Sequence, residues 1–165
     1  MSKLKVFIIS ILVLASAIAG CGPSESPQVT PAPAAESDTI TAAVQSAIKS
    51  FLSNDFASAQ KNMRLLPADQ KDPKTQLMFA DFSLHLNRRL ALEAKDTGLN
   101  APSPFISVSN VRAAETSGML ADVGIRAATG LEPLTLTVKA TLVSGSWMID
   151  FAPFMLALID SLGEE

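Results

Sequence analysis

The sequence predicts an α+β domain: three N-terminal helices packed on a curved antiparallel meander of about four strands, with a short C-terminal helix. Two observations support this. Between Ile40 and Leu90, apolar residues recur every three or four positions, which is the period of half-buried helices. From Ile106 onward the period changes to two, as in strands with one buried face. The segment 38–165 has the size of a single domain.

The first 20 residues have the composition of an export signal. The start is basic, and the run from Val6 to Ile18 is apolar apart from two serines. This run is too short to cross a bilayer, which takes about 20 apolar residues. It ends in small residues, as cleaved signal peptides do. We therefore expect residues 1–20 to be removed by cleavage between Gly20 and Cys21.

The residues Ile18-Ala19-Gly20-Cys21 resemble the lipobox of bacterial lipoproteins, in which an aliphatic residue and two small residues precede a cysteine. The resemblance implies that Cys21 is diacylated on sulfur and that the new amino terminus is acylated as well. Two or more acyl chains anchor a protein stably, whereas one binds a membrane only marginally. The alternative is an ordinary signal peptide with an incidental cysteine.

The residue after the cysteine, Gly22, bears on location. In the lipoprotein family, the lack of Asp at this position implies outer-membrane sorting, with the domain facing the periplasm, if the cell has two membranes. In a cell with one membrane, the implied location is the outer face of the plasma membrane. The expected partner of acylated Cys21 is therefore membrane lipid.

A spacer is expected between the anchor and the domain. The segment 22–37 reads GPSESPQVTPAPAAES, with four prolines and one large apolar residue, which is typical of a disordered linker. At about 3.1 Å per residue it reaches roughly 50 Å. Because Cys21 is the single cysteine, no internal disulfide can form, and the domain depends on its core.

The charge of the chain argues against nucleic acid as a partner. Of the 13 basic residues, Lys3 and Lys5 leave with the signal, so 11 remain against 16 acidic residues, a net charge of −5. There is no basic run, which excludes an electrostatic footprint for nucleic acid or anionic headgroups.

Three helices are expected first. The first is capped by Asp38 or Thr39 and ends at the turn 53–55. The second runs from Phe56 to about Leu66, where Pro67 stops it. The third spans 74–95 and is followed by a loop over 97–104. Its expected apolar side consists of Leu77, Phe79, Phe82, Leu86 and Leu90.

The strands follow. Near Asn110 the apolar residues move from even-numbered to odd-numbered positions, which predicts a bulge. Ser144-Gly145 predicts a two-residue hairpin turn. This turn pairs Leu142 with Trp147, Ala140 with Ile149, and Val138 with Phe151, which are all apolar pairs. Matching Met119 to Leu142 in the preceding hairpin places Asp122 opposite Lys139, and Lys139 opposite Asp150.

A terminal helix is expected over 153–162, with Pro153 in its first turn, where proline is tolerated. It is apolar almost all round. It is therefore either buried on several sides or paired with an envelope protein or a second copy of the chain.

The order of these elements resembles a nuclear transport factor 2-like domain, as found in small bacterial lipoproteins. The resemblance rests on the Asn-Asp-Phe-x-x-Ala junction at 54–59 and on the Ser-Trp-Met-Ile-Asp strand at 146–150, and it covers about residues 39–151. It implies a cone whose sheet curls around a pocket. Members include isomerases, dehydratases and non-catalytic binding domains, so the fold does not decide activity.

The expected inner face of the sheet holds no general acid or base, and the chain has no tyrosine. The ligand-binding candidates on that face are Trp147, Leu142, Val138 and Phe151. Asp81 and His85 form the best catalytic pair, because a spacing of four places them on one helix face. The alternative for this pair is an ordinary solvated face. With one histidine and one cysteine, we expect no metal and no cofactor.

The leading hypothesis is a non-catalytic, lipid-anchored envelope domain that binds a small apolar ligand or an envelope protein through the sheet concavity or the 153–162 helix. One alternative is a lyase- or isomerase-like enzyme that uses His85 and Asp81. The other is a purely structural envelope domain with a filled core.

The anchor is tested by Cys21→Ser. We expect this change to abolish lipidation and to leave the precursor uncleaved at this site, because the acylated sulfur is lost. Mass spectrometry of the membrane fraction measures both effects, with Ser24→Ala as a matched control. Unchanged membrane attachment and processing of the Cys21→Ser chain would overturn the lipobox assignment.

Overall fold

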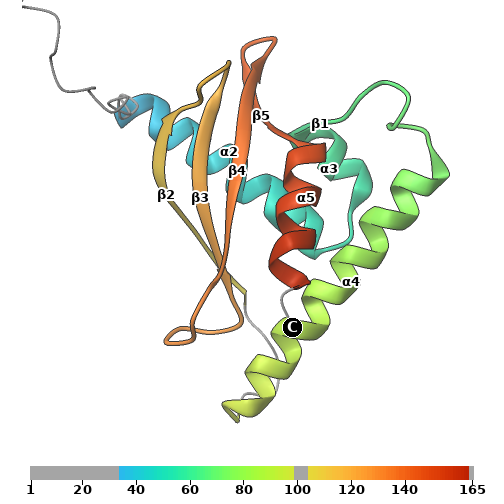
Figure 1. The fold of residues 1–165 in the computed structure, drawn as a ribbon, viewed down its shortest axis with the longest axis vertical. Coiled ribbons are helices and arrows are strands. Elements are labelled where there is room, and N and C mark those ends of the chain that lie inside the picture. Colours follow the sequence, from blue (N-terminus) through green and yellow to red (C-terminus); the bar gives the residue numbers. More distant parts are fainter. Residues whose placement is uncertain (1–33, 99–103, 164–165) are drawn as a thin grey trace, which may run out of the picture.

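The computed structural model describes residues 34–98 and 104–163, so the signal, Cys21 and the linker up to residue 33 lie outside the described residues. Figure 1 shows the elements, which are, in order, α2 (Ala34–Leu52), α3 (Phe56–Asn62), β1 (Met63–Arg64), α4 (Pro73–Asp96), β2 (Phe105–Ala113), β3 (Met119–Arg126), β4 (Leu134–Val143), β5 (Ser146–Asp150) and α5 (Phe151–Leu162). The α+β class is confirmed.

The sheet has the strand order β1-β5-β4-β3-β2. Strands β2 to β5 form the expected antiparallel meander, and β1 adds to β5 in parallel, so the sheet is mixed and open. Helix α2 crosses one face of the sheet from β2 to β5, and α5 packs beside β4, while α4 lies outside them (Figure 1). Strand β3 alternates strictly between buried and half-buried residues, so one face of the sheet is core.

The hairpin of β4 and β5 has the expected register. Leu142 pairs with Trp147 and Ala140 with Ile149, around a turn in which Ser144 and Gly145 have φ of 50° and 83°. Two positive φ values are what a type I′ turn requires. The pairing of Val138 with Phe151 is not formed, because Phe151 already begins α5.

The expected bulge is also present. The register of β2 against β3 shifts between Ser109 and Arg112, and Asn110 has φ of 49°. Asparagine tolerates this left-handed conformation better than most residues do.

The register predicted between β3 and β4 is wrong by two residues. Met119 pairs with Ala140, which places Asp122 opposite Thr137 and leaves Leu142 beyond the end of β3, with 55% of its surface exposed. Lys139 lies opposite Leu120, and its Nζ donates to Thr116 Oγ1. A shift of two residues keeps every side chain on its face, so alternation does not distinguish the two registers.

The turn before β3 supports the observed register. Gly118 has φ of 93°, and a Cβ at this position would contact the carbonyl oxygen of Ala140. Only glycine allows the chain to approach β4 this closely.

The helix boundaries differ in three places. Helix α2 begins at Ala34, so residues 34–37 are helical rather than part of the linker. Helix α3 ends at Asn62, because the buried Met63 pairs with Ile149 and opens β1. Helix α5 begins two residues before Pro153, which still lies in its first turn.

Helix α4 matches its predicted range within a residue at each end. Asp72 caps it by accepting from the backbone nitrogens of Lys74 and Thr75. The prediction for Leu77 is wrong, because this side chain is 64% exposed rather than on the apolar side.

The three long helices meet at Phe51. Its ring stacks edge to face with Phe79 of α4 at 4.9 Å and with Phe154 of α5 at 5.1 Å between ring centroids. Helix α4 also satisfies the last carbonyls of α2: Ser83 Oγ donates to Phe51 O at 2.6 Å, and Asn87 Nδ2 donates to Leu52 O at 2.8 Å. These contacts fix α4 and α5 relative to one scaffold helix.

We expect Phe51→Ala to lower the free energy of unfolding by about 3–5 kcal/mol, because it leaves a cavity where three helices meet. Urea unfolding of the chain from Gly22 onward, followed by Trp147 fluorescence, measures this. The control is Leu66→Ala, whose side chain is 70% exposed and whose loss costs well under 1 kcal/mol. Equal losses in the two variants would contradict the central place of Phe51.

Candidate functional site

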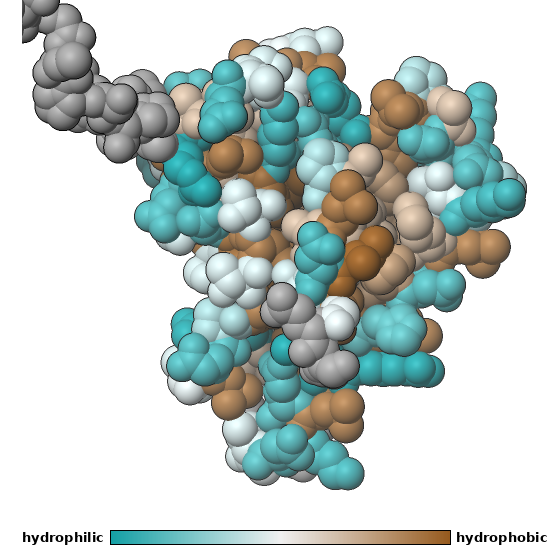
Figure 2. Space-filling model, viewed as in Figure 1, coloured by the Kyte–Doolittle hydropathy of each residue, from teal (hydrophilic) through white to brown (hydrophobic). Residues whose placement is uncertain are grey.

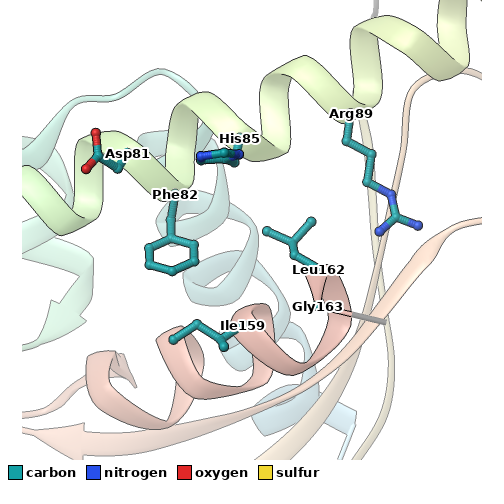
Figure 3. A pocket seen from close by; sticks show the side chains of 7 residues that line it. All are labelled: Asp81, Phe82, His85, Arg89, Ile159, Leu162 and Gly163. Carbon is teal, nitrogen blue, oxygen red and sulfur yellow. The ribbon is translucent and has the colours of Figure 1, made fainter. Parts of the chain in front are cut away.

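A groove of about 520 Å³ lies between α4 and α5. Figure 3 shows its lining, which consists of Asp81, Phe82, His85 and Arg89 from α4, and Ile159, Leu162 and Gly163 from the end of α5. Figure 2 shows apolar surface over α5 on this side of the molecule, where Leu156 and Ile159 are 61% and 39% exposed. The groove is therefore a candidate functional site.

The spacing of the α4 residues explains the lining. Positions three, four or seven apart share a helix face, so Phe82, His85 and Arg89 all border the groove from one side of α4. The apolar floor comes from Phe82, Ile159 and Leu162, and the polar rim runs from Asp81 past His85 to Arg89. From Asp81 to Arg89 the rim is about 12 Å long, at about 1.5 Å per helical residue.

Arg89 holds the two walls of the groove together. Its Nη1 donates to Ser161 O at 3.2 Å, and its Nε lies 3.2 Å from Glu93 Oε1. Helix α5 has no basic residue in its own last turn, so Arg89 supplies the positive charge that the helix dipole favours there. The width of the groove therefore depends on Arg89.

His85 and Asp81 both line the groove and are both exposed. The sequence placed them on one face of the helix, and the structure agrees. Within the described residues, however, no hydrogen bond joins the carboxylate to the imidazole. The pair thus lacks the contact by which a carboxylate orients a histidine base.

A second hollow of about 370 Å³ adjoins the groove on the C-terminal half of α4. Its lining consists of His85, Arg88, Arg89, Leu92, Glu93 and Asp96. His85 and Arg89 line both the groove and this second hollow, so the two hollows adjoin along one stretch of α4.

The four candidates on the sheet do not line the groove. Val138 and Phe151 are core residues, with 0% and 4% of their surface exposed, and Trp147 is half-buried. Leu142 is exposed near the β4–β5 turn. The α5 side of the groove was not expected; its signal in the sequence was a terminal helix that is apolar almost all round.

Two carboxylates of the sheet bond to neighbouring strands and stabilise the fold. Asp122 accepts from Asn110 Nδ2, Arg112 Nη1 and Thr137 Oγ1 at 2.9–3.0 Å, which ties the bulge of β2 to β3 and β4. Partial burial raises the pKa of Asp122, but these hydrogen bonds and the charge of Arg112 outweigh it, so the pKa lies below its ordinary value.

The second carboxylate, Asp150, is buried at the start of α5. Its Oδ2 accepts from Thr141 Oγ1 at 3.1 Å. Its Oδ1 lies 2.9 Å from Arg64 Nε as an ion pair, although the angle is not that of a hydrogen bond. The register of β4 against β5 agrees with the expected position of Lys139 opposite Asp150, but Lys139 donates to Thr116 Oγ1 and the carboxylate contacts Arg64 of β1.

Comparison with known protein families, curated proteins and solved structures finds no match for this chain. In the described part of the chain, no three histidine, cysteine or carboxylate side chains come together as a metal site. No helix among residues 34–98 and 104–163 has the length and apolar character needed to cross a membrane.

The pKa of Asp122 predicts a pH effect. A depressed folded pKa contributes stability above the unfolded value of about 3.9, and this contribution is lost as the pH falls through the folded value. We expect Asp122→Asn to lower the free energy of unfolding by about 1 kcal/mol at pH 7, and the difference from wild type to shrink below about pH 3.9. Urea unfolding at pH 7 and pH 3 measures this, and a difference that stays constant with pH would contradict it.

Proposed function

We propose that this chain is a lipid-anchored protein of the cell envelope whose folded domain binds a small apolar ligand without catalysis. The lipobox-like residues 18–21 support the anchor. The groove between α4 and α5 supports the binding role, and its apolar floor is the observation that carries the proposal. The ordering of helices before a four-stranded meander supports a nuclear transport factor 2-like relationship.

The groove has the size and chemistry of a small-molecule site. Such sites hold about 300–1,000 Å³ and combine an apolar lining with a few polar groups. Phe82, Ile159 and Leu162 offer contact to an apolar body, while the rim offers hydrogen bonds. The expected ligand is therefore apolar over most of its length and carries one polar or anionic group toward His85 and Arg89.

The groove is preferred to the sheet concavity as the binding site. The inner-face residues of β3 and β4 between Ala121 and Ala140 are packed under the helices, and Val138 has no exposed surface. A ligand at this position would have to displace core side chains, which costs several kcal/mol. In the groove, the apolar surface is already open.

A second candidate function is a lyase- or isomerase-like enzyme. The observation that favours it is that His85 and Asp81 open into the same groove. A histidine base must reach the substrate proton within about 2.6–3.2 Å, directly or through one water. The non-catalytic role is preferred because His85 has no orienting hydrogen bond within the described residues.

Binding is tested with the fluorophore 1-anilinonaphthalene-8-sulfonate, which combines apolar rings with an anionic group. We expect saturable fluorescence enhancement on the chain from Gly22 onward, and about tenfold weaker binding in Ile159→Asp, because a carboxylate then lies in the apolar floor. The matched control is Leu66→Asp, at a leucine that is more exposed and outside the groove lining. Equal binding by both variants would overturn the assignment of the groove.

A further inference from the structure

The outward ridge of α4 carries three exposed leucines. It lies opposite the buried positions 79, 83, 86 and 90. Its members are Leu77, Asp81, Leu84, His85, Arg88 and Leu92, all exposed. The three leucines keep 64%, 49% and 64% of their surface. Single exposed leucines need no explanation, but three on one ridge indicate a contact surface.

Several residues of the ridge would face complementary residues in an antiparallel copy of α4. Leu77 and Leu92 lie equally far from the midpoint between Leu84 and His85. Asp81 and Arg88 also lie equally far from this midpoint, and they carry opposite charges. An antiparallel copy of the helix, centred on the same point, therefore places Leu77 against Leu92 and Asp81 against Arg88. Leu84 then faces His85, and the exposed Lys74 and Lys95 face each other at the two ends of the ridge.

We propose that α4 packs antiparallel against α4 of a second copy of this chain, about a two-fold axis between Leu84 and His85. In such an isologous contact every interaction occurs twice. Asp81 of each copy pairs with Arg88 of the other, and Leu77 of each packs on Leu92 of the other. The contact closes on itself as a dimer and leaves no ridge open for a third copy.

The state of the two charges supports this pairing. Within the described residues, neither Asp81 nor Arg88 has a hydrogen bond or an ion pair of its own. On the sheet, by contrast, Arg112 is paired with Asp122 and Arg64 with Asp150. A second copy supplies the counter-charges that the fold itself does not.

The dimer goes beyond the proposed ligand binding, and its ridge shares Asp81 and His85 with the rim of the groove. The ridge from Leu77 to Leu92 is about 22 Å long, which is a small interface, so the dimer is weak in dilute solution. Two copies held at one membrane have a much higher effective concentration. The dimer is therefore best sought in the membrane.

Cross-linking of the full chain in cells tests the axis. The wild-type chain contains only Cys21 and gives the background. We expect Leu84→Cys to yield an oxidant-dependent dimer on non-reducing gels, because the two introduced thiols meet near the axis. Lys61→Cys is the matched control, since it is equally a surface position but lies on α3. His85→Cys is a second variant at the same axis and is expected to cross-link as well.

Charge reversal tests the pairing. In the Leu84→Cys background, Asp81→Arg and Arg88→Asp are each expected to reduce the dimer about fivefold to tenfold, because each turns two attractions into two repulsions. When the two reversed chains are expressed together with different tags, their charges are complementary again. We expect the mixed dimer to return to the level of the parent Leu84→Cys chain.

Three outcomes would overturn the proposal. One is a dimer band of equal strength from Lys61→Cys, and another is a failure of co-expression to restore the mixed dimer. The third is a Leu84→Cys thiol that membranes shield from a water-soluble maleimide while no dimer forms, since this would identify lipid as the occupant of the ridge.

Discussion

The relative positions of α2, α4 and α5 depend on the side chain of Phe51. Its ring lies between Phe79 and Phe154, and so it joins α2 to α4 and to α5 at one point of the core. Two hydrogen bonds, one of them buried, strengthen this junction, since Ser83 and Asn87 complete the C-terminal turn of α2. Because a buried carbonyl without a partner costs about 1–3 kcal/mol, the two helices are held in one relative orientation. The groove is the space left between α4 and α5 when both are fixed to α2.

Some polar side chains of the domain are bonded to neighbouring elements, and others are exposed without such a bond among the described residues. The carboxylates of Asp122 and Asp150 are bound by neighbouring strands, and they stabilise the bulge of β2 and the addition of β1. Asp81, His85 and Arg88 lie on α4, where the fold gives them exposure rather than partners. These exposed side chains are the ones available to a ligand or to another chain. Binding and association are thus both expected on the same helix.

The parts of the fold that follow from local rules agree with the sequence. The Ser144-Gly145 turn, the bulge at Asn110 and the buried face of β3 all come from residue type and alternation. The strand β1 could not be seen in this way, because two residues carry no period and their pairing with β5 is long-range. The β3–β4 register failed for another reason. A shift of two residues preserves alternation, and the deciding contact is the approach of Gly118 to β4.

In the candidate site, too, some features follow from the local sequence and others depend on tertiary packing. By itself the sequence determined that Asp81 and His85 share a face of one helix, since a spacing of four fixes this in any α-helix. It also determined the element types, because hydrophobic period is a local property. Only the tertiary structure decided that Ile159 and Leu162 form the opposite wall, that Leu142 is exposed, and that Val138 and Phe151 are core. The physical reason is that these facts depend on how α5 returns to pack against Phe51, and a contact between residues a hundred positions apart leaves no periodic trace in the sequence.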